Sequence, residues 1–432
     1  MHCRRKLNMS ESLTQTRRKF HRFPEVGFTE YITTYEIYRA LEGTGFKRHL
    51  GHDVLVPSKR VGLPSQETLD SSYQRALDYG VPKEFLEKIK DGMTGLVATI
   101  DTKKPGPHFA ARFDIDGLPI TESRDDDHFP HTENFISTHE GEMHACGHDG
   151  HITVGLNVAK YISDSIEQLK GKFTIIFQAA EESVRGAQAV VEKGWLDDVD
   201  YFFSLHLGIR KLPVGTVSLS TTDFLATTKF DAHFTGKSAH AGVEPNEGNN
   251  SLLAASTAAL NLSAIPRHRD GTTRINTGSL KAGSGRNVVA DSATMEIESR
   301  GETTALNDYM FERSVKVLKA AADMYDNDVD IEVVGQAINA NISPDLVKEI
   351  KDTVQNTNGV MDLKDSLPLG ASEDVTFMID RVQKGGGQAT YMLFPFDLKF
   401  GHHHPKFDLD EAVLPLAVEV LQNITRSVMK AD

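Results

Sequence analysis

Residues 143 to 151 read Met-His-Ala-Cys-Gly-His-Asp-Gly-His, and the rest of the chain can be interpreted outward from them. Cys146 and His148 stand on either side of a glycine, so a tight turn can direct both side chains to one point. Thiolate, imidazole and carboxylate groups are the ligands of zinc and similar divalent metals. The stretch therefore predicts a metal site, with a solvated polar loop as the alternative when it is taken alone.

Composition limits the class of protein. The chain has 432 residues, 39% hydrophobic and 25% charged, as expected of a globular protein with two or three domains. Its formal charge of −14 argues against nucleic acid or an anionic membrane as a partner. Cys3 and Cys146 are too few for a disulfide framework, and no apolar run is long enough to span a membrane. We therefore expect a cytoplasmic protein that binds neither nucleic acid nor membrane.

Short apolar runs alternate with helical segments in the first half of the chain. The runs are residues 96–100, 108–113, 173–177 and 201–205. Runs of this kind are typical of strands buried on both faces of a parallel sheet. A helix is predicted at about 150–169, and the polar, helix-prone segment 57–93 is interpreted as an insertion outside the core. The expected fold is α/β, with a mostly parallel sheet and helices on both of its faces.

The pattern changes after Gly215 to half-exposed strands of alternating polarity. The predicted strands are 228–234, 274–280, 292–298 and 329–334, and the helices are 250–264 and 305–325. This order is the split βαβ, or ferredoxin-like, arrangement of a compact α+β module. We expect an inserted lid and dimerisation domain at 222–336, between two parts of a catalytic domain at 1–221 and 337–432.

Two acidic motifs follow predicted strands. In residues 112–119, Asp114 and Asp116 end a strand, and one of them is expected in the crevice where open α/β sheets bind ligands. Glu181 and Glu182 end the next strand, and adjacent carboxylates are costly unless a cation holds one of them. The other carboxylate can then act as a general base on water. The alternatives are an acidic loop for the first motif and a helix start for the second.

Histidines follow two later strands. His206 ends a buried strand, where a histidine satisfied within the core is the alternative to a ligand, and residues 402–404 are three consecutive histidines. With the earlier cysteine, histidine and glutamate, these donors exceed what one four-coordinate metal needs. They suit two divalent ions about 3.5–4 Å apart that share a ligand and a water. The residues alone therefore indicate metal-assisted hydrolysis and leave the bond class open.

Six ordered motifs resemble a known family. They are residues 21–28 (HRFPEVGF), 114–119 (DIDGLP), 146–151 (CGHDGH), 178–182 (QAAEE), 236–242 (GKSAHAG) and 372–374 (SED). From about residue 15 to 430 the chain resembles the dinuclear-metal amidohydrolases of the aminoacylase/carboxypeptidase superfamily. The relevant branch includes hippurate hydrolase and the indole-acetyl-amino-acid hydrolases. Residues 57–93, 227–236 and 282–289 are most similar to members of that branch that cleave p-aminobenzoyl-glutamate.

The resemblance implies roles for particular residues. The implied metal ligands are Cys146, His148, Glu182, His206 and His403, with His402 as the alternative to His403. Glu181 is implied as the general base toward the attacking water, and Asp116 as the residue that orients a metal-binding histidine. His240 is implied as a donor to the oxyanion of the tetrahedral intermediate, often in the active site of the partner subunit.

The resemblance also implies the substrate and the partners. Arg286, Asn287 and Arg300 are candidates for holding the glutamate carboxylates, with a surface salt bridge as the alternative for Arg300. The expected cofactors are two divalent ions per chain, manganese or alternatively zinc. The expected reaction cleaves p-aminobenzoyl-glutamate, an N-acyl-glutamate formed in folate breakdown, to p-aminobenzoate and glutamate. The expected assembly is a homodimer or a heterodimer with a related second subunit. The alternatives are a hippurate-like or indole-acetyl-amino-acid substrate, or a chain that is active only with its sister chain.

Overall fold

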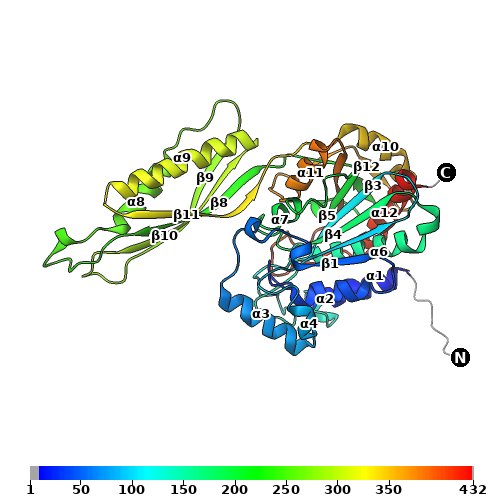
Figure 1. The fold of residues 1–432 in the computed structure, drawn as a ribbon, viewed down its shortest axis with the longest axis horizontal. Helices are drawn as coiled ribbons and strands as arrows, with labels where there is room; N and C mark the ends of the chain where they lie inside the picture. Colours follow the sequence, from blue (N-terminus) through cyan, green and yellow to red (C-terminus); the bar gives the residue numbers. More distant parts are fainter. Residues whose placement is uncertain (1–8, 431–432) are drawn as a thin grey trace.

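The computed structural model describes residues 9–430, so Cys3 lies outside the described residues. Figure 1 shows a larger domain built around a sheet and an elongated second domain that extends from one side of it. Within the described residues, no helix is both long and apolar enough to cross a membrane.

The larger domain is organised by an eight-stranded sheet in the order β1-β2-β4-β3-β5-β14-β6-β12. Its strands are β1 (Lys47–Leu50), β2 (Leu96–Asp101), β3 (His108–Asp114), β4 (Lys172–Gln178), β5 (Tyr201–Lys211), β6 (Thr216–Ser218), β12 (Asp362–Lys364) and β14 (Gln388–Phe396). The central strands β4, β3, β5 and β14 are mutually parallel, and antiparallel pairs flank them. The predicted mostly parallel sheet is confirmed, whereas the short strands β1, β6 and β12 were not predicted.

Helices cover both faces of this sheet, as the sequence predicts. One face carries α1 (Met9–His21), α6 (His148–Asp164), α10 (Pro344–Gln355) and α12 (Val413–Met429). The other face carries α7 (Ala187–Val191) and α11 (Val375–Lys384). Each face of the sheet packs against its own hydrophobic core. The strands between the two cores are therefore buried on both sides.

Residues 57–93 form the predicted helical insertion, and most of its buried residues pack in a cluster separate from the two cores of the sheet. The segment forms the short helix η2 (Pro57–Lys59), α3 (Gln66–Tyr79) and α4 (Lys83–Leu86). Phe85 and Leu86 are buried against Tyr31 of α2 (Tyr31–Ala40), in a hydrophobic cluster of their own. Because apolar residues are sparse in this stretch, the sequence pattern hides the few that pack together.

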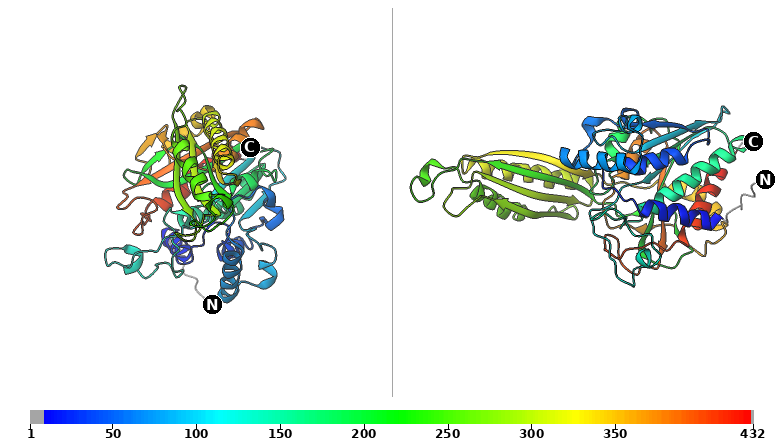
Figure 2. Two further views of the ribbon diagram at one scale, coloured as in Figure 1. Left: turned by 90° about the vertical axis from the view of Figure 1, so that its left-hand side faces the viewer. Right: turned by 90° about the horizontal axis from the view of Figure 1, so that it is seen from below.

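The second domain, which we call the lid, is a four-stranded antiparallel sheet in the order β11-β8-β10-β9. Its elements follow in the order β8 (Ala226–Thr235), α8 (Ser251–Ser263), β9 (Thr273–Ala282), β10 (Ser292–Gly301), α9 (Thr304–Asp323) and β11 (Asp328–Ala337). Both helices pack on one face of the sheet around a small core (Figure 2). The predicted ferredoxin-like module is therefore confirmed.

The lid joins the larger domain beside the loop that follows β4. The amide of Gln336 donates to the carbonyl of Val184 at 2.8 Å. A Cβ at Gly335 would overlap the carbonyl of Ser183, so only glycine permits this close approach. The loops 236–250 and 283–291 lie at the opposite end of the lid, which we call the lid tip (Figure 1).

Candidate metal centre

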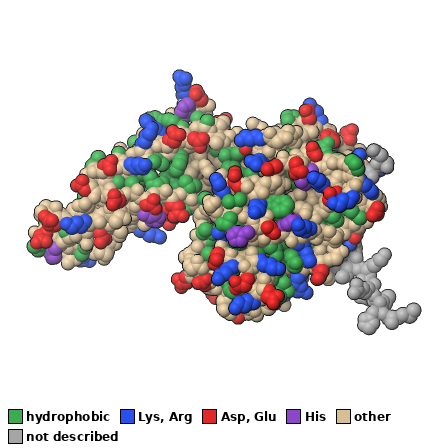
Figure 3. Space-filling model, in the orientation of Figure 1, with side chains coloured by type: hydrophobic (Ala, Val, Ile, Leu, Met, Phe, Trp, Pro, Cys, Tyr) green, Lys and Arg blue, Asp and Glu red, His purple; other side chains and the backbone are tan. Residues whose placement is uncertain are grey.

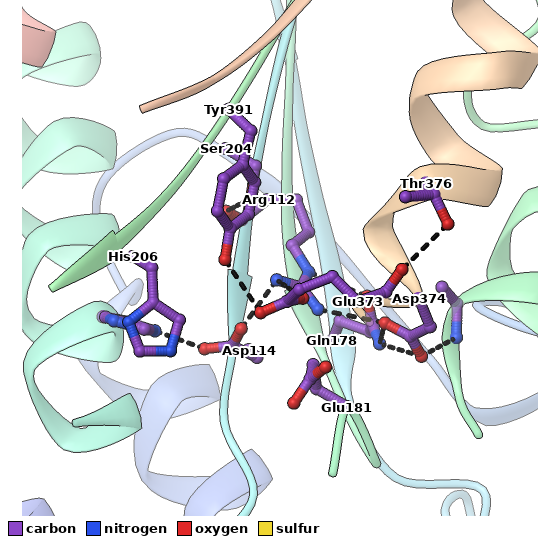
Figure 4. Close-up of polar contacts among 12 residues, drawn as sticks. Arg112, Asp114, Gln178, Glu181, Ser204, His206, Glu373, Asp374, Thr376 and Tyr391 are labelled. Carbon is purple, nitrogen blue, oxygen red and sulfur yellow. Dashed lines mark hydrogen bonds and ion pairs between the residues drawn. The ribbon is translucent and has the colours of Figure 1, made fainter. Parts of the chain in front are cut away.

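The carboxyl ends of the parallel strands gather the predicted donors in one crevice. Glu181 and Glu182 follow β4, and His206 lies within β5. Cys146 and His148 come from the start of α6, which packs against β3, β4 and β5. Figure 4 shows His206, Asp114 and Glu181 in this region, close to the end of β3. The crevice is where open α/β sheets place their ligands.

The Cys146–His148 turn depends on the glycine between the two ligand candidates. Gly147 has a φ of 87°, a left-handed conformation that side chains rarely adopt. His148 begins α6, and its Nδ1 donates to the carbonyl of Asp116 at 2.9 Å. Its Nε2 is buried and makes no hydrogen bond within residues 9–430, although the Oδ1 of Asp114 lies 3.6 Å away. Burial lowers the pKa of His148, but Asp114 and Asp116 raise it to about 10, so a cation bound at Nε2 would displace the proton from that nitrogen.

His206 is fixed in the same way from the neighbouring strand. Its Nδ1 donates to the carbonyl of Leu207 at 2.8 Å, which leaves Nε2 unprotonated. This Nε2 lies 3.4 Å from the Sγ of Cys146. Both side chains are buried, so the thiol and the imidazole face one another away from bulk water. The two groups offer sulfur and nitrogen donors to one ion.

The loop after β4 is held in an unusual conformation. Ala180, Ser183 and Val184 have positive φ values of 55°, 68° and 61°, which is uncommon outside glycine. The carboxylate of Asp116 accepts the amides of Glu181 and Glu182 at 3.1 and 3.0 Å. Because Asp116 also contacts His148, one residue orients three members of the predicted site.

The histidines near the C-terminus occupy different surroundings. His402 is largely buried, and its Nε2 accepts the amide of Ile209 at 2.8 Å. His403 has a φ of 65°, is half exposed, and places its Nε2 at 3.4 Å from the Oε1 of Glu182. Each lies near Cys146, in two separate groups of possible ligands. The amide occupies the Nε2 lone pair of His402, whereas Nε2 of His403 points to a carboxylate.

A buried arginine, which the sequence reasoning gave no role, lies behind the crevice. Arg112 donates to Gln178 at 2.8 Å, to Asp114 at 2.6 Å and to Asp374 at 3.2 Å (Figure 4). Asp374 accepts the amides of residues 186 and 187, which fixes the far side of the loop that carries Glu181. A charged residue inside an apolar strand is the signal that could have identified this network.

The electrostatics of the crevice favour bound cations. Burial, with the carboxylates of Glu182 and Glu181, raises the pKa of the Cys146 thiol well above its ordinary value. Burial, with Glu373 and Glu182 nearby, also raises the pKa of Glu181. Divalent ions beside these groups would reverse both trends and stabilise the ionised forms. In the described part of the chain the buried Oε1 of Glu182 has no hydrogen-bond partner, which is a further sign that the donor set fits a metal.

Several overlapping groups of donors in this crevice could hold ions. In each, the ligand atoms lie within 4.8 Å of one another. The groups are Cys146, His206 and His402; Cys146, Glu182 and His403; His148, Glu181 and Glu182; Asp114, His148 and His151; and Glu181, Glu373 and Asp374. Because Cys146 and Glu182 each belong to two groups, the arrangement suits a pair of ions that share ligands.

A cavity of about 300 Å³ opens onto these donors. On one side it is lined by Cys146, Glu181, Glu182, His206, Glu373, His402 and His403. Ile209 and Leu369 supply apolar surface. The lid contributes Lys229, Glu298 and Arg300, of which only Arg300 was singled out from the sequence. The cavity is therefore bounded by both domains of one chain.

The other predicted lid residues lie away from the cavity of their own chain. His240, Arg286 and Asn287 belong to the loops at the lid tip and are exposed. His240 pairs through its backbone with Val288, so the two loops form one surface. None of these three residues lines the cavity.

Comparison with known proteins places this geometry in context. Residues 110–427 match the model of "Peptidase family M20/M25/M40". The chain is 44% identical to "Indole-3-acetyl-aspartic acid hydrolase" of Enterobacter agglomerans, covering 95% of this chain and 94% of the relative. It is 42% identical to a protein of Escherichia coli named as one subunit of p-aminobenzoyl-glutamate hydrolase, covering 96% and 95%. A solved structure of the aminobenzoyl-glutamate utilization protein from Klebsiella pneumoniae is 39% identical, with a TM-score of 0.83 over 96% and 95% of the two chains.

Proposed function

This chain belongs to peptidase family M20/M25/M40 and is an amide-bond hydrolase, and on that premise we propose that it cleaves p-aminobenzoyl-glutamate to p-aminobenzoate and glutamate. The observation that carries the proposal is the buried set of sulfur, nitrogen and carboxylate donors beside Glu181, at the floor of a cavity shared with the lid. Relatives of over 40% identity, matched along nearly their whole length, are named for N-acyl derivatives of acidic amino acids.

Two divalent ions are the proposed cofactors, manganese in the first place and zinc as the alternative. Cys146, His148, Glu182, His206 and His403 are the residues that would hold them. His403 is preferred to His402 because the Nε2 of His402 already accepts the Ile209 amide. When bound, such ions polarise the substrate carbonyl and lower the pKa of water.

Glu181 is the proposed general base. Its carboxylate lies beside those of Glu182 and Glu373, and its backbone is held by Asp116. From this position it takes a proton from the attacking water and delivers it to the amine that leaves when the amide bond breaks. Asp116 is proposed as a positioning residue. The carbonyl and the carboxylate of Asp116 both face Nδ1 of His148 and so fix the orientation of that ring.

The lid tip is proposed to complete the site of a partner subunit. His240 would donate to the oxyanion, and Arg286 and Asn287 would hold the α-carboxylate of the substrate. This assignment requires a second copy or a related chain, since the lid tip lies at the far end of the lid from the cavity of its own chain (Figure 1).

The lid also offers surfaces for pairing in a homodimer or a heterodimer. Strand β9 is an edge strand of the lid sheet, and such edges need a cover. Leu252, Leu253 and Leu260 of α8 are exposed, Leu260 by 75%. Figure 3 shows apolar side chains among the charged ones along the lid. A site built around a free thiol further supports a reducing, cytoplasmic location.

The experiment that tests the proposal is product release by the purified chain. The protein is stripped with a chelator, reloaded with manganese or zinc, and assayed for p-aminobenzoate and glutamate. Metal-dependent release of both products supports the proposal. A protein that binds two metals and releases neither product, alone or with a related second chain, would refute it.

Indole-acetyl-aspartate is the second candidate substrate, because the 44% identical relative is named for it. The same assay with indole-acetyl-aspartate, hippurate and p-aminobenzoyl-glutamate ranks the three by kcat/KM. A preference for indole-acetyl-aspartate would keep the chemistry and change the acyl group. A preference for hippurate would remove the requirement for a second carboxylate.

A further inference from the structure

Two basic side chains project from the lid into the cavity, next to the point where the lid joins the catalytic domain. Lys229 lies on β8 and Arg300 on β10, and the two strands are hydrogen-bonded neighbours. In the register of this pair Lys229 is opposite Glu298, and Arg300 is opposite Thr227. Lys229, Glu298 and Arg300 all line the cavity that contains Cys146 and Glu181. The lid wall of the cavity is therefore charged.

Lys229 is a half-buried cation with no hydrogen-bonded or ion-paired partner in the described part of the chain. Its alkyl stem passes beside Gly335, where an added Cβ would come within 3.4 Å of the lysine Cδ. Among the described residues, its ammonium makes no hydrogen bond or ion pair. Burial lowers the pKa of Lys229, although Glu298 and Glu181 act in the opposite direction. A half-buried ammonium with three unused donors is costly unless an anion comes to it.

Arg300 is held in place by Glu298, the residue opposite Lys229 in the strand pair. Its Nη2 donates to the Oε1 of Glu298 at 3.0 Å, and the hydroxyl of Thr227, shared with the carbonyl of Ser299, lies 3.2 Å from the same oxygen. About a third of the Arg300 side chain stays exposed, and Arg300 is one of the residues that line the cavity. Two cations and one carboxylate leave this wall with one net positive charge, which matches one carboxylate of a ligand.

We propose that Lys229 and Arg300 together bind the side-chain carboxylate of the amino-acid half of the substrate, and so select acidic amino acids. The inference rests on the proposed function and adds to it. In the substrate, the α-carboxylate is attached to the same carbon as the scissile nitrogen. The side-chain carboxylate of glutamate or aspartate lies farther from that nitrogen, at the end of the side chain. It can therefore reach the lid wall while the amide lies over the metal donors. Lys229 and Arg300 belong to the same chain as those donors, unlike the lid-tip groups proposed for the α-carboxylate.

The test compares substrates that differ in one group. p-Aminobenzoyl-glutamate carries the side-chain carboxylate, p-aminobenzoyl-glutamine replaces it with an amide of similar shape, and p-aminobenzoyl-isoglutamine replaces the α-carboxylate instead. We expect Lys229→Met and Arg300→Leu to lower kcat/KM for the glutamate substrate by about 10- to 100-fold, mainly through KM. The glutamine substrate should change by less than about twofold, since it has no charge to lose.

Two further variants provide controls. Lys229→Arg keeps a cation at this position and should retain most of the preference for glutamate over glutamine. Lys319→Met removes an exposed lysine of α9 and should leave all rates unchanged. If Lys229→Met lowered kcat/KM equally for the glutamate and glutamine substrates, or spared only the isoglutamine substrate, the inference would be overturned.

A binding measurement separates this inference from the proposed function. Calorimetry of the metal-loaded protein with free glutamate and free glutamine reports on the carboxylate site without turnover. We expect tighter binding of glutamate, and loss of that preference in Lys229→Met. Equal affinity for the two amino acids in the unmodified protein would refute the carboxylate site even if the enzyme hydrolyses amides. A retained preference in a protein that hydrolyses none would support the site and refute the proposed reaction.

Discussion

His148 and His240 both lie in short motifs where histidine accompanies small residues, but the structure surrounds them in opposite ways. His148 is fully buried, its Nδ1 is committed to Asp116, and its Nε2 faces other donors. His240 is exposed at the lid tip, where its Nδ1 accepts the amide of Gly242, two residues along its own loop. The crevice therefore holds a preorganised donor set. The lid tip is instead an exposed surface, which the proposal places against the cavity of a partner subunit.

This contrast separates two requirements of the proposed reaction. Metal binding and proton transfer use groups that one chain brings together by folding. Oxyanion stabilisation by His240 uses a group that a single chain keeps away from its own cavity. A variant in the crevice should therefore inactivate the site of the chain that carries it. A variant at the lid tip should instead inactivate the site of the other chain in the dimer.

The largest effect is expected from loss of the metal donors. His148→Ala removes a nitrogen ligand and should abolish activity together with at least one equivalent of bound metal. His240→Ala should bind as much metal as the unmodified protein. Metal analysis of both dialysed variants checks this, and normal metal content in His148→Ala would contradict the assignment of the crevice.

Removal of the general base is expected to have the next largest effect. Glu181→Gln keeps the shape of the side chain and should lower kcat by about 10²- to 10⁴-fold without loss of metal. Steady-state kinetics with metal analysis tests this. Glu192→Gln, an exposed change after α7, is the matched control and should be neutral. Full activity in Glu181→Gln would show that another group takes the proton.

His240→Ala is expected to lower kcat by about 10²- to 10³-fold, the usual loss for one oxyanion donor. Mixing it with Glu181→Gln tests where His240 acts. If His240 acts across subunits, each mixed dimer has one intact site, and exchange of subunits should restore roughly a quarter of the activity. No recovery from subunits shown to exchange would place His240 in its own chain's site or outside catalysis.

The smallest effect on activity, with a clear effect on stability, is expected at Glu122. Glu122 contacts His21 at 2.9 Å and His128 at 2.8 Å, all buried behind the crevice. Burial alone would raise the pKa of Glu122, but His21 and the hydrogen bonds from His128 and residue 137 lower it to about 2. Glu122→Gln should lower the free energy of unfolding at pH 7 by roughly 2–3 kcal/mol.

The sign of the pH dependence follows from that shift. Because the pKa of Glu122 is lower in the folded protein, its contribution is present above about pH 4.5 and is lost as the pH falls toward 2. Denaturant unfolding of Glu122→Gln and of the exposed control Glu133→Gln should differ at pH 7 and converge at low pH. An equal difference at both pH values would exclude ionisation of Glu122 as the cause.

Much of the fold follows from local patterns. Buried parallel strands read as continuous apolar runs, and the lid strands alternate, so both sheets could be predicted. The strands β1, β6 and β12 have only three or four residues, and each exists because a neighbouring segment from another part of the chain pairs with it. The packing of 57–93 on α2 likewise depends on contacts that no periodicity reveals.

The donors of the candidate site were also predicted from residue type and position at strand ends, but the groups that orient them were not. Arg112 binds Asp374, which lies 262 positions later in the chain, and Asp374 in turn fixes the loop after Glu182. Lys229 belongs to a motif noted in the sequence, yet nothing local marks it as facing the metal donors. Such pairings appear only when distant segments pack together.

Residue types and their spacing were enough to give the donors of this protein, their order along the chain, and the two kinds of sheet that carry them. These properties depend on side-chain chemistry and on spacing within single strands and turns. Tertiary packing instead sets which nitrogen of each histidine already has a partner, places the amide of Ile209 on His402, and brings only the base of the lid to the cavity. Those outcomes depend on hydrogen bonds and burial between segments far apart in the chain, which local sequence cannot specify.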